Sequence, residues 1–117
     1  MYKKISQDSV NAFLNKETFN RENMAVSKGV REYDDCWYLM LFGNTIAKML
    51  PDGTIFISTC GWHTRTTQER LNCLLYTLGS TSRLRIRKFE PFLETQHGLL
   101  PWADDFMVRY RLDTKLY

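Results

Sequence analysis

The sequence lacks the features that mark secreted, membrane-spanning or disordered chains. It has three cysteines, an odd number without a Cys-x-x-Cys pair, so a disulfide framework is not expected and a reducing compartment is. No apolar run approaches about 18 residues, and the N-terminal residues lack the apolar segment of a signal peptide. These absences predict a cytoplasmic protein that does not enter a membrane.

Internal repeats, low-complexity tracts and Pro/Gly/Ser-rich linkers are also absent, and the three prolines stand singly. The composition is 44% hydrophobic and 14% aromatic, enough apolar surface to offset the conformational entropy lost on folding. At 117 residues the chain is long enough for one core and too short for two. Residues 1–117 are therefore predicted to form a single domain.

Charge is low overall and uneven along the chain. The formal net charge is +3. Residues 65–88 carry six cations against Glu69, a net charge of +5, whereas residues 31–64 and 89–117 each carry −2. The adjacent acids Asp34-Asp35 and Asp104-Asp105 could bind a divalent cation, but they are expected to be solvated turn residues. The local positive field suits an anionic partner such as a nucleic acid, although a solvated strand face made soluble by arginine explains it equally well.

A short helix is predicted near the N-terminus. Within residues 6–16, Val10, Phe13 and Leu14 follow the i, i+3, i+4 spacing of an amphipathic helix. Either Ser6 or Asp8 could cap its first turn.

Four strands are predicted next, at residues 24–30, 36–42, 45–50 and 54–59. The dipeptide Gly43-Asn44 tolerates positive φ and predicts a two-residue hairpin turn. Pro51-Asp52-Gly53 predicts a second tight turn. The last three of these strands should therefore form an antiparallel meander.

A second helix is expected to begin near Thr67. Thr66 and Glu69 have the spacing of a capping box, in which each side chain would bond to a backbone N–H of the first turn. Leucines then recur at i, i+3, i+4 and i+7, at positions 71, 74, 75 and 78. Gly79 is well placed to end the helix in a left-handed conformation.

Two further strands are predicted, at residues 83–87 and 106–112, each alternating arginine with apolar side chains. Between them, residues 88–105 should form a loop or an irregular hairpin. If the two strands pair, their arginines share one basic face: Arg83, Arg85, Arg87, Arg109 and Arg111. The whole pattern predicts an α+β fold, in which a meander and the C-terminal strands form an antiparallel sheet covered by the leucine helix.

Several short motifs occur in a fixed order over roughly residues 10–78. They include Gly43-Asn44-Thr45-Ile46-Ala47 and the longer run Gly61-Trp62-His63-Thr64-Arg65-Thr66-Thr67 with Arg70-Leu71-Asn72. In combination they resemble small, uncharacterised proteins of tailed bacteriophages, with the pattern G-N-x-I-A … G-W-x-T-x-T-T-x-x-R-L-N. The resemblance implies a phage gene expressed in a bacterial cytoplasm, and many small phage proteins act by blocking host factors. It carries no catalytic residue.

Two kinds of reactive site are conceivable. Cys60-x-x-His63 has the spacing of zinc ligands, with Cys73 and His97 as further candidates, but zinc sites need two closely spaced pairs. Cys60 beside a helix N-terminus could also be a nucleophile with His63 as its base, although no orienting acid is evident. We therefore expect neither a metal, a cofactor nor an enzymatic activity.

The loop at residues 61–67 is the favoured binding surface. Its hydroxyls, Arg65 and the Trp62 ring lie at the predicted start of a helix, where phosphate or nucleic acid could bind. Alternatively, a threonine caps the helix and Trp62 packs on the sheet. The predicted binding residues are Trp62, His63, Thr64, Arg65, Thr67 and the five strand arginines.

These residues favour a non-enzymatic protein that inhibits or redirects a host protein or nucleoprotein complex, plausibly an anti-defence protein such as an anti-CRISPR. Aromatic side chains and arginine, which protein interfaces favour, support this interpretation. The alternative is a nucleic-acid-binding accessory protein that uses the basic strands and the same loop.

Overall fold

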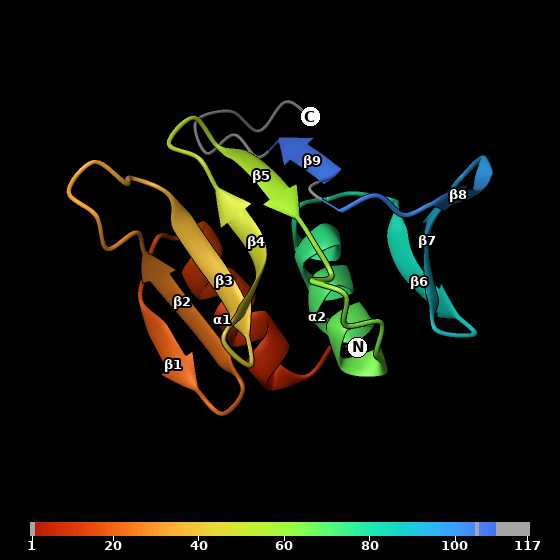
Figure 1. The fold of residues 1–117 in the computed structure, drawn as a ribbon, viewed down its shortest axis with the longest axis horizontal. Coiled ribbons are helices and arrows are strands. Elements are labelled where there is room, and N and C mark those ends of the chain that lie inside the picture. Colours follow the sequence, from red (N-terminus) through yellow and green to blue (C-terminus); the bar gives the residue numbers. More distant parts are fainter. Residues whose placement is uncertain (1, 105, 110–117) are drawn as a thin grey trace.

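The computed structural model describes residues 2–104 and 106–109 and has an α+β fold with two antiparallel sheets (Figure 1). In chain order the elements are α1 (Lys4–Leu14), β1 (Phe19–Arg21), β2 (Met24–Lys28), β3 (Trp37–Leu41), β4 (Asn44–Met49), β5 (Thr54–Ile57), α2 (Arg65–Thr77), β6 (Arg83–Arg87), β7 (Glu90–Thr95), β8 (Gly98–Pro101) and β9 (Phe106–Arg109). The large sheet has the order β1-β2-β3-β4-β5-β9, and the small sheet has the order β6-β7-β8. The predicted α+β class is confirmed, whereas the arrangement of the strands differs from the predicted one.

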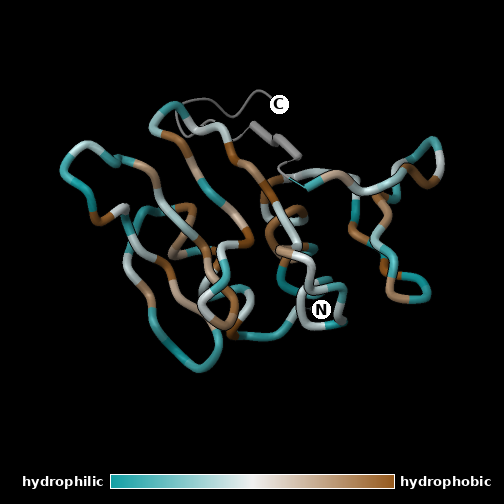
Figure 2. The backbone as a smooth tube through the Cα atoms, viewed as in Figure 1, coloured by the Kyte–Doolittle hydropathy of each residue, from teal (hydrophilic) through white to brown (hydrophobic). Residues whose placement is uncertain are grey.

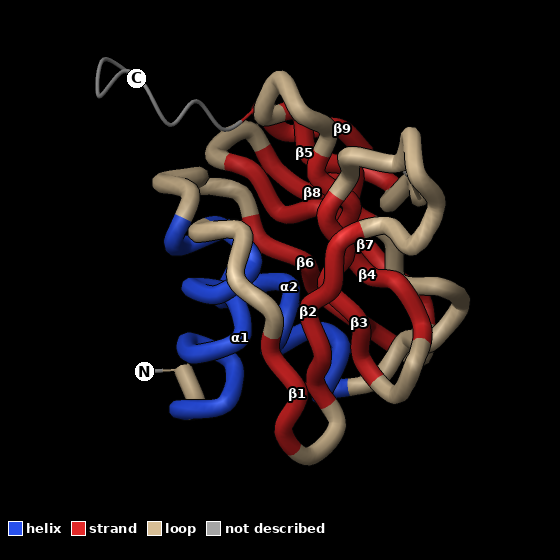
Figure 3. The backbone as a smooth tube through the Cα atoms, turned by 90° about the vertical axis from the view of Figure 1, so that its left-hand side faces the viewer, coloured by secondary structure: helices blue, strands red, loops and turns tan. Residues whose placement is uncertain are grey.

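Both helices lie on one side of the large sheet (Figure 3). Both helices and the central strands contain hydrophobic segments, drawn brown in Figure 2. The buried core includes Val10 and Phe13 of α1, Leu71 and Leu74 of α2, and Leu39 of β3. The predicted leucine stripe of the second helix therefore packs into the core. Neither helix among the described residues is long and apolar enough to cross a membrane.

Helix α1 begins two residues earlier than predicted. Lys3 occupies the N-cap position and makes no side-chain cap, so the predicted capping by Ser6 or Asp8 is wrong. Asp8 instead forms ion pairs with Lys4 at 3.2 Å and with Arg21 at 2.8 Å. Those cations lower the pKa of the Asp8 carboxyl.

A polar cluster fastens α1 to α2 and to the turn between β1 and β2. The carboxylate of Glu69 accepts hydrogen bonds from the backbone N–H of Lys3, from the Ser6 hydroxyl and from Arg70. The buried Arg70 also donates to Ser6 Oγ and to Asn23 Oδ1. Burial alone would raise the pKa of Glu69, but the hydrogen bonds from Ser6, Lys3 and Arg70 outweigh it and lower that pKa. We call these five residues the Glu69 clamp.

The predicted meander is confirmed as β3-β4-β5, with one turn displaced. The β3–β4 turn consists of Phe42 and Gly43, with φ values of 51° and 79°, rather than Gly43-Asn44. Asn44 instead opens β4 and pairs with Leu41. The Pro51-Asp52-Gly53 turn forms as predicted, because the N–H of Gly53 donates to the Leu50 carbonyl at 3.0 Å and Gly53 has a φ of 90°.

The C-terminal strands do not pair as predicted. Strand β6 pairs with β7, and β9 pairs with β5 at the edge of the large sheet. The segment expected to be a loop or an irregular hairpin forms β7 and β8, and β1 was not predicted. Residues 110–112 of the last predicted strand lie outside the described residues.

The small sheet lies beside α2 (Figure 1), and side-chain amides of the helix attach it. The Asn72 side chain accepts from the Leu84 N–H at 2.7 Å and donates to the Leu84 carbonyl at 3.0 Å. Gln68 accepts from the N–H of Ile86 at 2.9 Å. Two side chains of α2 thus take the place of a neighbouring strand along β6.

Candidate functional site

A tight turn after β5 projects the loop that the sequence favoured. Cys60 and Gly61 both have positive φ, 53° and 77°, and the N–H of Trp62 donates to the Thr59 carbonyl at 2.9 Å. The Cys60 thiol points back to the sheet and donates to the Thr45 carbonyl at 2.7 Å. This reversal leaves the Trp62 side chain 57% exposed.

The next residues start α2, and they do so without the predicted capping box. Thr64 is the N-cap, and its hydroxyl oxygen accepts from the Thr67 N–H at 3.2 Å. The buried Thr67 hydroxyl lies 3.1 Å from the same oxygen, so both side chains serve the helix end. Glu69 belongs to the clamp instead, because its carboxylate faces α1. Of the predicted binding residues here, Thr64 and Thr67 have local structural roles.

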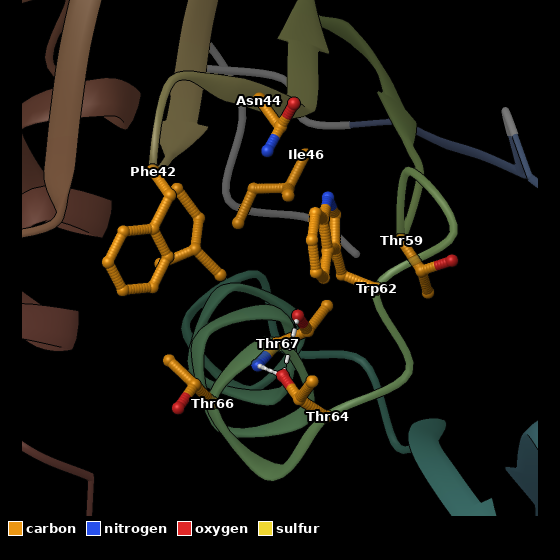
Figure 4. A pocket seen from close by; sticks show the side chains of 9 residues that line it. Phe42, Asn44, Ile46, Thr59, Trp62, Thr64, Thr66 and Thr67 are labelled. Carbon is orange, nitrogen blue, oxygen red and sulfur yellow. Dashed lines mark hydrogen bonds between the residues drawn. The ribbon is translucent and has the colours of Figure 1, made fainter. Parts of the chain in front are cut away.

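A pocket of about 280 Å³ lies between this loop and the β3–β4 turn (Figure 4). Phe42 and Trp62 stand on opposite sides of it, Ile46 lies between them, and the start of α2 closes one end. The complete lining is Leu41, Phe42, Asn44, Ile46, Thr59, Trp62, Thr64, Thr66 and Thr67. None of these side chains is charged, so the pocket suits an apolar group.

A third exposed aromatic lies next to this loop. His63 Nδ1 is 3.0 Å from the Phe89 carbonyl, which brings the β6–β7 turn against the residue that follows Trp62. Phe89 is 85% exposed and Phe42 is 71% exposed. We call Phe42, Trp62 and Phe89 the aromatic end of the molecule.

Two members of the aromatic end occupy backbone positions that bulky residues disfavour. Phe42 has a φ of 51° and Phe89 a φ of 64°, both in two-residue hairpin turns. Such turns favour glycine, asparagine and aspartate, because a left-handed residue with a side chain costs about 1–2 kcal/mol. Both rings are exposed, so packing in the core does not explain why phenylalanine occupies these positions. Residues in such conformations cluster at functional sites.

The predicted arginine face is not assembled. Arg83, Arg85 and Arg87 lie on β6 and Arg109 on β9, in different sheets, and Arg111 is outside the described residues. Arg85 forms an ion pair with Glu94 at 3.0 Å. Arg83 donates to the carbonyls of Ser80 and Ser82 and lies over the Tyr76 ring. Arg65 belongs to the loop itself, and the exposed Arg87–Lys88 end of β6 lies near it, because the Phe89 carbonyl contacts His63.

Asp104 ties the end of β5 to the segment that follows β8. Its carboxylate accepts from the Thr59 N–H at 3.0 Å, from the Thr59 hydroxyl and from the Trp102 indole at 2.9 Å. Burial would raise the pKa of Asp104, but these hydrogen bonds lower it. The prediction that this acid is a solvated turn residue misses its connecting role.

The geometry offers nothing for the reactive sites that the sequence suggested. Cys60 and His63 bond to different carbonyls, those of Thr45 and Phe89. Cys73 is buried, and burial raises the pKa of its thiol to about 11. Over residues 2–104 and 106–109, no group of three His, Cys, Asp or Glu side chains could hold a metal ion.

The sequence found Trp62 but missed the other wall of the pocket. The signal that could have found Phe42 is a bulky residue before glycine between two strands of strong propensity, which is the first position of a two-residue turn. Placing the turn one residue later concealed it. Lys88-Phe89 carried no turn signal at all.

Comparison with known proteins places the chain among phage proteins. Residues 2–112 match a family described as the Kyanoviridae Gp96 protein, and the chain belongs to this family. The predicted phage origin is thereby supported. No curated protein and no solved structure matches the chain.

Proposed function

We propose that this protein is a non-catalytic binding protein that inhibits or redirects a factor in the cytoplasm of the bacterial host, with an anti-defence role such as that of an anti-CRISPR. The Phe42–Trp62 pocket would take an apolar side chain of that partner. The observation that carries the proposal is the pair of exposed aromatic walls around an uncharged pocket. Aromatic side chains dominate the energetics of protein interfaces.

The strained turn at Phe42 and the exposed Phe89 support the same surface. Phe42 lowers the stability of its hairpin relative to asparagine or glycine, and it is not buried in return. Arg65 and Lys88 are exposed near the loop, so a partner segment with acidic residues beside its apolar anchor fits best.

A capture experiment with matched variants tests this proposal. Tagged wild-type protein should recover a stoichiometric host protein from bacterial lysate, and Trp62→Ala or Phe42→Ala should weaken that capture about tenfold or more. Tyr33→Ala is the control, because Tyr33 is 81% exposed in the loop between β2 and β3 and does not line the pocket. Equal capture by all four proteins would contradict the proposed surface, and no captured protein would contradict the proposed function.

Direct nucleic-acid binding is the second candidate. The exposed Trp62 ring and the neighbouring Arg65 support it, since single-stranded nucleic acids bind by stacking and phosphate contact. It predicts binding of labelled single-stranded DNA or RNA that weakens steeply as salt rises from about 50 mM to 200 mM. No binding at the lower salt concentration would eliminate it.

A further inference from the structure

Strand β8 is a free edge of the small sheet with unusual composition. It pairs only with β7 among the described strands, and its four residues Gly98–Pro101 are all exposed. From Thr95 to Ala103 the chain has no Asp, Glu, Lys or Arg. Natural sheets usually place charges on such edges to prevent pairing with another chain.

Two other edges in the molecule are protected. The outer edge of β6 is filled by the amides of Asn72 and Gln68. Strand β1 is only three residues long and carries Arg21, which pairs with Asp8. Strand β8 is also short and carries Pro101, but it has no charged residue and, in the described part of the chain, no side-chain amide covers its outer edge.

The pairing of β8 with β7 determines which backbone groups of β8 point outward. Thr95 and Gly98 flank a two-residue turn, and the N–H of Trp102 donates to the Pro91 carbonyl. In an antiparallel pair the bonded residues alternate, so Gly98 and Leu100 bond inward to β7. Leu99 then directs both its N–H and its carbonyl outward, and Pro101 directs only a carbonyl outward.

An apolar row also runs across the small sheet to this edge. Leu84 pairs with Leu93, and Leu93 pairs with Leu100, so the three side chains lie on one face. Leu84 is fully buried against α2, Leu93 is half-buried and Leu100 is 53% exposed. The apolar row therefore ends with an exposed leucine at the edge of the sheet.

We propose that β8 pairs antiparallel with β8 of a second copy of this chain across a two-fold axis, with Leu100 opposite Leu100. In this register the Leu99 N–H of each copy donates to the Pro101 carbonyl of the other, so the missing N–H of proline leaves no donor unmatched. The leucine row continues into the second copy, and the uncharged strands meet without like charges opposite each other. A second copy thus satisfies the outward backbone N–H of Leu99, extends the leucine row and brings no charge to the edge. Such a self-complementary contact is the usual form of a two-fold dimer.

Cysteine cross-linking tests the register. In a background with Cys36→Ser and Cys60→Ser, Leu100→Cys should form an intermolecular disulfide on mild oxidation. The Cα atoms of a non-hydrogen-bonded pair lie about 4.5 Å apart, which is within the range that a disulfide spans. Leu99→Cys is the matched control, since Leu99 faces Pro101 of the second copy. Cross-linking of Leu99→Cys but not Leu100→Cys would overturn the proposed register.

Solution mass tests the interface itself. Sedimentation equilibrium of the wild type should show a concentration-dependent dimer, and Leu100→Lys should raise its dissociation constant about tenfold or more. Val30→Lys is the control, because Val30 is fully exposed in the loop after β2. A wild type that stays monomeric at millimolar concentration, or a dimer that Leu100→Lys leaves unchanged, would overturn the proposal. This inference does not depend on the proposed function, which uses a different surface.

Discussion

The large sheet and the small sheet are held to the same helix by different forces. Strands β2–β5 pack an almost continuous set of buried apolar side chains against α1 and α2. The small sheet contributes one fully buried side chain, Leu84, and depends on the amides of Asn72 and Gln68 for its position. A wide apolar interface tolerates the loss of one contact, whereas the small sheet loses much of its attachment when one of its few hydrogen bonds to α2 is lost. The small sheet should therefore open independently of the large one.

The largest difference in the free energy of unfolding should come from a leucine-to-alanine substitution made once in the main core and once in the small sheet. Leu74→Ala removes a fully buried side chain and should lower the free energy of unfolding by about 3 kcal/mol. Leu93→Ala, at a half-buried site of the small sheet, should cost about 1 kcal/mol. Urea denaturation measures both. Equal losses would show that the small sheet is part of the same cooperative core.

Asn72→Ala should release β6 specifically. It leaves the buried N–H and carbonyl of Leu84 without partners, at a cost of about 2 kcal/mol. Hydrogen exchange should accelerate at Leu84 and Ile86 and stay slow in β3 and β4. Asn11→Ala, an exposed change on α1, is the control. Uniform acceleration in both sheets would contradict independent opening.

Acid should weaken the attachment of α1 to α2 through the Glu69 clamp and leave the amide contacts between α2 and β6 in place. The pKa of Glu69 is lowered in the folded protein, so the clamp stabilises the fold above the ordinary value of 4.5 and this contribution is lost as pH falls through the lowered pKa. Asn72 and Gln68 do not titrate. Glu69→Gln should destabilise the protein at pH 7 by about 1–2 kcal/mol, since it leaves Arg70 buried without its counter-ion, and should flatten the acid limb of the stability profile. An unchanged acid limb would contradict a role for the clamp.

The exposed ion pair of the small sheet should matter least. Arg85 and Glu94 are both well exposed, so Arg85→Ala should change the free energy of unfolding by about 0.5 kcal/mol or less. Thermal denaturation at low and high salt should give almost the same difference between variant and wild type. A larger loss would mean that this pair, rather than the amides of α2, orients the small sheet.

The sequence predicted the elements governed by local patterns and missed those governed by pairing. The helices, the meander and the left-handed end at Gly79 follow from periodicity and turn chemistry; the Gly79 φ is 82°. Alternation in residues 83–87 correctly indicated a strand, but it contains no information on its neighbour, and the amides that seal β6 come from a helix. The capping box failed because Glu69 has a more distant set of partners in α1.

The candidate site could be predicted only in part for a related reason. A loop rich in hydroxyls and one indole is visible in the sequence at residues 61–67, and Trp62 does line the pocket. Its opposite wall comes from a hairpin about twenty residues earlier, and only the folded meander brings the two together. Contacts of this kind depend on register, which a single sequence specifies weakly.

Because Phe42 and Phe89 have left-handed backbone conformations, laboratory selection of variants can show whether their rings contact a partner. A library of this chain selected only for folding should drift to asparagine or glycine at both positions, because these residues fit a φ near 51° or 64° with less strain. Selection under infection would retain the rings wherever a partner contacts them. The positions at which the two lineages diverge would map the working surface even while the partner is unidentified.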